Sequence, residues 1–229
     1  MRILFLLIFS AIFANDRSWD EKLLYSASFS GVDVATATLK SKKFKNIQNQ
    51  DILRIEFKAK SKPSLKYIFP INDKIIVDVD LNTWQPLKVE KKIREGSYKQ
   101  NSLSSFDHKN NIFIYKKDSI SYEGEIFNPY SLIYYFRTLD FTSDSNYKIQ
   151  VIDNKKVTPL KFFTDKKVEV ETAFGKFYAN KIWPKKINGE PFKNAGKITI
   201  WVSDKDKLPI IINLKMKFGS LNLELEEVN

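Results

Sequence analysis

Apolar and polar residues alternate with a period of two along most of the chain. This pattern is typical of β-strands that bury one face and expose the other. Residues 52–60 show it clearly, because one side carries only apolar residues (Leu53, Ile55, Phe57, Ala59) and the other only charged residues among positions 54–60 (Arg54, Glu56, Lys58, Lys60). The pattern predicts strands at 22–29, 32–39, 52–60, 75–80, 87–95, 98–106, 112–115, 119–123, 147–153, 157–163, 167–172, 177–185, 198–202, 208–217 and 221–227.

One segment breaks the alternation and predicts a helix at about 129–139. Asn128 is a favourable N-cap residue, and Pro129 fits the first helical position. Apolar residues then recur at near-helical spacing, at Leu132, Ile133, Tyr135, Phe136 and Leu139. The predicted fold is therefore mainly β, with twelve to fifteen strands in curved antiparallel sheets, either an open barrel or sandwich-like. We expect the helix to cover the concave face of a sheet or the end of a barrel.

The N-terminus has the order of features found in signal peptides. Arg2 supplies positive charge, residues 3–9 form an apolar run, and Ala14 is a small residue before a polar stretch. The run is too short to span a bilayer, which takes roughly 20 residues. The sequence predicts a signal peptide at 1–14 that is cleaved after Ala14, followed by a single β domain at 15–229. The predicted location is the periplasm; the alternatives are secretion, or anchoring by an uncleaved signal. No transmembrane span is expected in the mature chain.

Composition restricts the chemistry. The chain has no cysteine, which excludes disulfides, cysteine nucleophiles and thiolate metal sites. Its formal charge is +11, but the lysines are spread along the whole length. A nucleic-acid site would gather them on one face, so no nucleic-acid partner is expected. The spread favours lysines that solubilise and protect sheet edges, rather than attraction to an anionic surface.

The sequence offers no catalytic or metal-binding set. His108 is the only histidine, and it lies in a polar stretch that indicates a surface loop. Metal sites draw on clustered ligands, so neither a metal nor another cofactor is expected. Carboxylates at alternate strand positions could serve glycoside hydrolysis or bind a cation. The interpretation as solvated strand faces is preferred for each such pair: Asp78 with Asp80, Glu169 with Glu171, and Glu224 with Glu226.

Aromatic residues crowd the predicted helix, which ends in an arginine. Arg137 lies one turn after Tyr134 and two turns after Tyr130. These three residues are candidates for binding an anionic or sugar ligand through hydrogen bonds and cation–π contact. The alternative, which we prefer, is that the tyrosines pack in the core and Arg137 complements the helix C-terminus.

Several short motifs, taken in order, resemble a bacterial exported family called domain of unknown function 3108. They are the opening stretch 24–39, the turn from Asp80 to Pro86, Phe106-Asp107, the segment Asn128–Arg137 with Pro129 and Ser131, Phe174-Gly175, Trp201 with Asp204 and Asp206, and Pro209 followed by Gly219. The resemblance covers essentially the whole mature chain. It departs at Asn128, where the family favours Asp. It implies an exported protein of curved antiparallel sheets and supplies no reaction, cofactor or catalytic residue.

Together these features predict a periplasmic, non-enzymatic protein. The leading hypothesis is that the curved sheet and its helix bind an amphipathic or envelope-derived ligand, such as a lipid or a glycan. One alternative is a structural or protein-interaction module of the cell envelope that uses its sheet edges. A weaker alternative is a carbohydrate-active enzyme with a carboxylate pair.

Overall fold

The structure, a computed structural model, describes residues 19–229 except 69, 142–147, 191–196 and 217–218. The predicted signal segment 1–14 lies outside the described residues. The elements are β1 (Glu21–Phe29), β2 (Val32–Lys45), β3 (Asp51–Ser61), β4 (Asn72–Asp80), β5 (Pro86–Glu95), β6 (Tyr98–Asp107), β7 (Ile112–Tyr115), β8 (Asp118–Ser121), β9 (Ile126–Phe127), α1 (Pro129–Phe136), β10 (Lys148–Asp153), β11 (Lys156–Thr172), β12 (Gly175–Lys186), β13 (Lys197–Ser203), β14 (Pro209–Met216) and β15 (Gly219–Val228).

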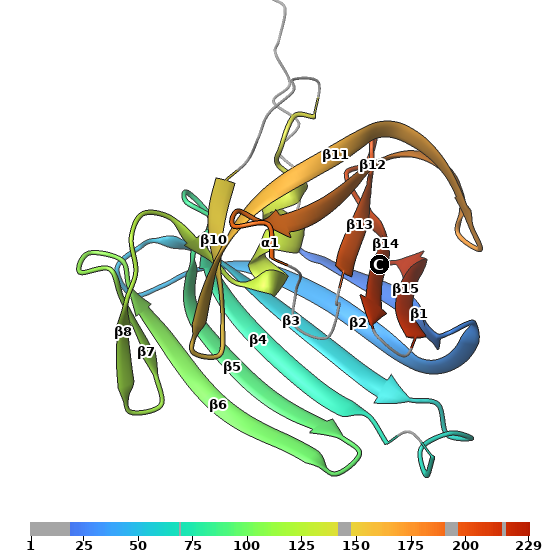
Figure 1. Cartoon of the computed structure of the whole chain (residues 1–229), viewed down its shortest axis with the longest axis horizontal. Helices are drawn as coiled ribbons and strands as arrows, with labels where there is room; N and C mark the ends of the chain where they lie inside the picture. Colours follow the sequence, from blue (N-terminus) through green and yellow to red (C-terminus); the bar gives the residue numbers. More distant parts are fainter. Residues whose placement is uncertain (1–18, 69, 142–147, 191–196, 217–218) are drawn as a thin grey trace, which may run out of the picture.

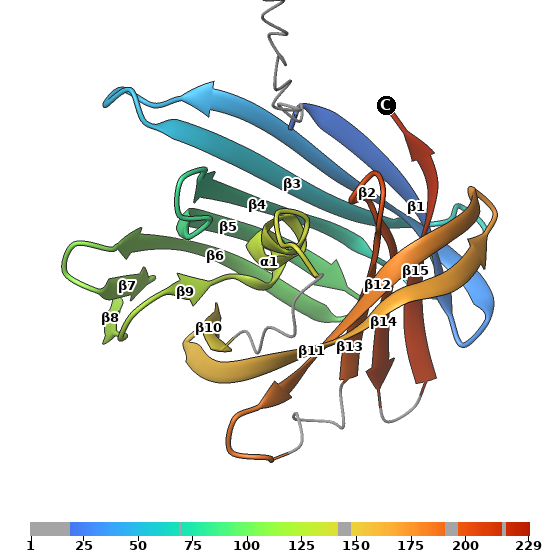
Figure 2. The same cartoon turned by 90° about the horizontal axis from the view of Figure 1, so that it is seen from above.

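All the strands belong to one 15-stranded sheet in the order β8-β7-β6-β5-β4-β3-β2-β1-β15-β14-β13-β12-β11-β10-β9. Every pair is antiparallel except β9 with β10. The first strand pairs with the last, in a register that sets Ala27 opposite Leu223. The two ends of the domain therefore meet in the middle of the sheet, and the middle of the chain forms both sheet edges (Figures 1 and 2).

The predicted alternation is confirmed where the strands lie over the core. In β4, Ile75, Val77 and Val79 are buried, whereas the residues between them are partly exposed. The outer face is charged: Lys58, Lys74 and Lys92 are neighbours across β3, β4 and β5. Glutamates on the same face pair with these lysines, Glu56 with the first two and Glu90 with the third.

The prediction of separate strands at 157–163 and 167–172 is wrong, because both belong to the single bent strand β11. Its pairing with β12 shifts register between Asp165 and Val168, and Lys167 has a φ of 50°. A bulge of this kind bends a strand and increases its twist. The polar residues 164–167 mark this bend within one strand.

The predicted helix exists, but it is shorter than expected. The Asn128 side chain accepts a hydrogen bond from the Tyr130 amide, and the Ser131 hydroxyl accepts one from the Asn128 amide, a reciprocal cap. The helix ends at Phe136 rather than Leu139, and the chain continues through 3₁₀-type turns, in which the amides of Arg137 and Thr138 donate to carbonyls three residues earlier. Figure 2 shows α1 inside the concave side of the sheet, as the sequence predicts. Among the described residues, no helix is both long and apolar enough to cross a membrane.

Side-chain packing brings the two sheet edges together. No ladder joins β8 to β9, so the sheet stays open, although only residues 122–125 separate these strands in the chain. A small hydrophobic cluster of Phe113, Tyr115, Tyr122, Ile126 and Ile152 contains residues from both sides of the gap. The main core lies on the concave face and includes most of α1. The two edges of the open sheet are therefore in contact through side-chain packing and not through backbone hydrogen bonds.

Candidate functional site

Two adjoining pockets lie between α1 and the concave face of the sheet. The smaller has a volume of about 350 Å³ and the larger about 720 Å³. Both are lined by Pro129, at the start of α1, and by Asp153 and Asn154, at the turn between β10 and β11. The start of α1 and this turn therefore border both pockets. Each pocket has a volume that can hold a small ligand.

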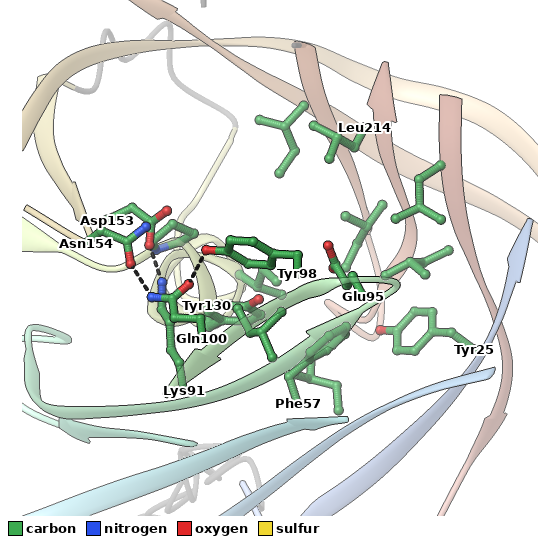
Figure 3. A pocket seen from close by; sticks show the side chains of 18 residues that line it. Tyr25, Phe57, Lys91, Glu95, Tyr98, Gln100, Tyr130, Asp153, Asn154 and Leu214 are labelled. Carbon is green, nitrogen blue, oxygen red and sulfur yellow. Dashed lines mark hydrogen bonds and ion pairs between the residues drawn. The ribbon is translucent and has the colours of Figure 1, made fainter. Parts of the chain in front are cut away.

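The pocket walls are mainly apolar because inward positions of the strands carry branched and aromatic side chains. The smaller pocket (Figure 3) uses β1–β3 on one wall and β14–β15 on the other, with Tyr25, Leu39, Phe57, Ile212, Leu214, Leu221 and Leu223. The larger uses β11–β13, with Leu160, Phe162, Ile182, Pro184, Ile198 and Ile200. The same alternation that makes the sheet amphipathic therefore lines the cavity.

A group of paired polar side chains separates the two pockets. The Lys91 ammonium on β5 forms an ion pair with Asp153. The Gln100 amide on β6 donates to the Asn154 side chain at 2.7 Å, and the Tyr98 hydroxyl donates to the Gln100 amide oxygen at 3.0 Å (Figure 3). These contacts fasten the β10–β11 turn to the opposite wall across the opening of the sheet.

An acid pair lies at the mouth of the smaller pocket. The Glu95 carboxyl lines this pocket and is hydrogen-bonded to Asp73, which is buried. Asp73 also accepts a hydrogen bond from the Arg94 amide at 2.8 Å. Partial burial and the neighbouring Asp73 raise the pKa of Glu95 to about 7. The Glu95 carboxyl therefore keeps part of its proton near neutral pH.

Tyr130, one of the three predicted ligand-binding residues, lines the smaller pocket. Its ring packs against Phe57, with ring centroids 5.3 Å apart. Burial raises the pKa of its hydroxyl, and the carboxylates of Asp153, Asp73 and Glu95 add to this effect. The phenol is therefore neutral and can both donate and accept a hydrogen bond.

Tyr134 and Arg137 lie elsewhere, in a closed cluster at the other end of the helix. The Arg137 guanidinium forms a two-point ion pair with Glu21, and its Nε donates to the Lys207 carbonyl at 2.8 Å. It also faces the rings of Trp19 and Tyr134, 5.2 and 5.0 Å from their centroids. Burial lowers the pKa of Arg137, but the hydrogen bonds and charge of Glu21 outweigh burial and raise it.

The structure thus separates the three predicted residues. Tyr130 lies at a cavity, whereas Tyr134 and Arg137 are fully buried and neither lines one of the two pockets. This matches the alternative interpretation, in which Tyr134 packs in the core. Arg137 lies at the helix C-cap and pairs with a carboxylate from β1.

The positions of the family motifs lie mostly at turns and caps. The Asp80 carboxylate accepts from the Asn82 amide, while Pro86 opens β5 and its carbonyl meets the His108 ring at 2.8 Å. Pro129 and Ser131 begin α1. The Pro209 carbonyl accepts a hydrogen bond from the Tyr25 hydroxyl at 2.8 Å, and the Asp204 carboxylate accepts one from the Asn180 side chain. Trp201, on β13, packs at the margin of the core. Such residues fix the path of the chain at its reversals.

His108 is more enclosed than the sequence indicates. Its ring is half-buried, stacks on Phe106 and lies 2.7 Å from the Tyr122 hydroxyl. The prediction of a surface loop histidine is wrong in this respect, because the turn folds back onto the strand ends. Within the described part of the chain, no group of three His, Asp or Glu residues is close enough to hold a metal ion.

The acid pairs at alternate strand positions lie away from both pockets. Asp78 is held by Arg54 in a two-point contact of 2.7 and 2.8 Å on the outer face of the sheet. Glu169 and Glu171 are exposed, and Glu224 accepts from the amide of Ala173. None of these carboxylates lines either of the two pockets.

Sequence analysis did not single out Lys91, Glu95, Tyr98, Gln100 or Asp153. One signal could have found the first of them. Lys91 falls between two apolar residues of the same strand face (Val89 and Ile93), which places a charge on the inward side. The contacts of β5 and β6 with the β10–β11 turn join residues far apart in the chain; Lys91 and Asp153 are separated by 62 positions. Such contacts leave no local pattern in the sequence.

The family model of a protein of unknown function, DUF3108, matches residues 24–226. The chain belongs to this family, as the order of motifs predicts. Among curated proteins, none is significantly similar to the chain. A solved structure of similar fold is a beta-barrel-like protein of domain of unknown function DUF1849 from Brucella abortus. It is 10% identical, covers 91% of this chain and 96% of its own, and has a TM-score of 0.60. At this identity the likeness concerns the fold alone.

Proposed function

We propose that this protein is an exported, non-enzymatic binding protein that holds the apolar part of an amphipathic, envelope-derived ligand against the concave face of its sheet. The observation that carries the proposal is the pair of apolar pockets between α1 and the concave face of the sheet, which side chains leave unfilled. Side chains that line an empty apolar pocket lack dispersion contacts on one side, which lowers the stability of the fold. A bound ligand would supply these contacts and offset the loss of stability. The N-terminal signal pattern supports export.

The interaction-module alternative has weaker support. It would use an exposed strand edge, but β8 has four residues and β9 only two, and the hydrophobic cluster of Phe113, Tyr115, Tyr122, Ile126 and Ile152 packs between them. Short, covered edges are a common protection against pairing with another chain. The cavity therefore favours ligand binding over edge pairing.

Native mass spectrometry of the protein from its own periplasm tests the proposal. We expect the spectrum to contain the mass of a co-purifying lipid-like molecule or glycolipid. We also expect the polypeptide mass to match a chain that begins at Asn15. The variant Ile200→Trp should lose the ligand, because the larger ring fills the larger pocket. Its matched control is Ile114→Trp, at an exposed outer position of β7. Loss of ligand in both variants, or no ligand across gentle preparations, would support the interaction-module alternative instead.

A further inference from the structure

The smaller pocket is acidic although the protein as a whole is basic. The chain carries a formal charge of +11. Within the described residues, Lys91 is neutralised by Asp153, and neither Asp73 nor Glu95 takes part in an ion pair. The pocket mouth therefore has carboxylate charge that no described cation compensates. A carboxylate charge without a compensating cation favours a ligand of the opposite sign.

Four aromatic residues line this pocket. Tyr25, Phe57, Tyr98 and Tyr130 line the same pocket as Glu95 and come from four different elements. Figure 3 shows Tyr25, Phe57, Tyr98 and Tyr130 among the side chains that line this pocket together with Glu95. Rings with a negative π face next to a carboxylate form the arrangement that recognises alkylated ammonium groups.

The hydroxyls of these tyrosines are not equivalent. Those of Tyr25 and Tyr98 are occupied, by the Pro209 carbonyl and by Gln100. The Tyr130 hydroxyl has no hydrogen-bond partner among the described residues. A neutral phenol that is free to accept a hydrogen bond provides a further contact for an ammonium that carries N–H groups.

We propose that the smaller pocket binds a positively charged ammonium headgroup, with Glu95 and Asp73 as its counter-charge and Phe57, Tyr98 and Tyr130 as its aromatic cage. This inference rests on the proposed function, since the apolar chain of the same ligand occupies the adjoining hollow. It excludes fatty acids and other ligands whose only charge is negative, because their carboxylate would face Glu95.

Competition binding tests the headgroup. A fluorescent apolar probe, N-phenyl-1-naphthylamine, is displaced from the full chain by four ligands with the same dodecyl chain: dodecyltrimethylammonium, dodecylphosphocholine, dodecanoate and dodecyl maltoside. All are used below their critical micelle concentrations, at pH 8. We expect dodecyltrimethylammonium to bind roughly tenfold more tightly than dodecanoate. If dodecylphosphocholine binds as tightly as dodecyltrimethylammonium, the natural headgroup comes from a zwitterionic lipid. If it binds weakly, the natural headgroup is a free amine. Both results support the headgroup site.

Variants locate the effect. Glu95→Gln should abolish the preference for the ammonium and leave dodecyl maltoside affinity unchanged, whereas its matched control Glu171→Gln, at an exposed position on β11, should behave as the wild type. Tyr130→Phe keeps the π face and should retain trimethylammonium affinity, whereas Tyr130→Leu should lower it severalfold. A far-UV circular dichroism spectrum equal to that of the wild type shows that each variant is folded.

The outcomes separate the two proposals. If dodecyl maltoside displaces the probe but the four ligands bind equally, or dodecanoate binds best, the headgroup site is overturned and the apolar cavity stands. The same holds if Glu95→Gln keeps the ammonium preference. If no dodecyl ligand displaces the probe, or the probe does not bind at all, the proposed function itself is overturned.

Discussion

Arg137 at the end of α1 and Glu95 at the mouth of the smaller pocket are two ionisable side chains in opposite surroundings. Arg137 is fully buried, but it has a two-point partner in Glu21, a backbone carbonyl and two aromatic faces. Glu95 is more exposed, yet its nearest ionisable neighbour is another acid, Asp73. The charge of Arg137 is therefore compensated within the protein, whereas the charge of Glu95 has no compensating cation among the described residues. The difference shows that burial of a charge does not by itself indicate whether the charge has a compensating partner.

The largest effect is expected at the compensated charge, Arg137. Arg137→Leu leaves the Glu21 carboxylate, whose side chain is 11% exposed, without its cation. Loss of one partner of a buried pair should lower the free energy of unfolding by about 3–5 kcal/mol, measured by urea denaturation. The double variant Glu21→Leu/Arg137→Leu should recover part of this loss, because no charge is then left unpaired.

Ligand binding sharpens the same comparison. We expect folded Arg137→Leu protein to keep the preference for dodecyltrimethylammonium over dodecanoate, since neither Arg137 nor Glu21 lines the pockets. A loss of stability below 1 kcal/mol, or a changed headgroup preference, would contradict the assignment of this cluster to the structural core.

An intermediate effect is expected at the Lys91–Asp153 pair, where only one partner is buried: the lysine side chain is 8% exposed and the aspartate 51%. Lys91→Met keeps the length of the side chain and removes the pair, and Asp153 can then be solvated. We expect a loss of about 1 kcal/mol in local stability. It should appear as roughly fivefold faster amide hydrogen exchange at residues 153–156.

The control for this prediction is Lys155→Met. Lys155 forms an ion pair with Asp118, and both side chains are more than half exposed. Exposed pairs contribute little, so exchange at the turn should change less than twofold. Equal effects of the two variants would show that Lys91 does not fasten the turn across the opening of the sheet.

The smallest effect is a pH dependence at Glu95. Its pKa is about 7 in the folded protein against an ordinary value of 4.5, so the folded state binds this proton more tightly than the unfolded chain. The resulting stabilisation is fully present below about pH 4.5 and is lost as the pH rises through about 7. Because Glu95 is exposed to solvent, we expect a difference of about 1 kcal/mol or less.

Glu95→Gln should remove this dependence, because the amide resembles the protonated acid. The variant should equal the wild type in unfolding free energy at pH 4.5 and exceed it at pH 8, in paired urea titrations. Since other titrating groups are common to both proteins, the difference reports the pair with Asp73. A variant that is less stable than the wild type at pH 8 would mean that a cation compensates Glu95.

The strands show how far sequence reasoning reaches. Alternation identified the inward faces of β3 and β4, because the side-chain period of a strand is set by local backbone geometry. It failed at the bend of β11, where polar residues within one strand have the same composition as a turn. The helix was found through its cap, but its end was misplaced because Leu139 continues the apolar spacing after the α-helical hydrogen bonds have stopped.

The candidate site was predicted less well. Tyr130 and Tyr134 were both selected because aromatic residues cluster on one helix, but only Tyr130 lines a pocket, whereas Tyr134 packs in the core. Glu95 and Asp73 were not found. Both are ordinary charged residues of β-strands, and only the antiparallel pairing of β4 with β5 brings them together.

The sequence by itself determined the β class, the position of the helix, the family and the absence of cysteine chemistry. Each of these depends on composition, on local periodicity or on the order of short motifs. The tertiary structure alone decided that β1 pairs with β15, that the middle of the chain forms both edges, and that Glu95 and four aromatic residues line one pocket. The physical reason is that strand pairing joins residues far apart in the chain. Each inward side chain is fixed by its own strand, but its neighbours across the cavity are fixed by the closure of the whole sheet.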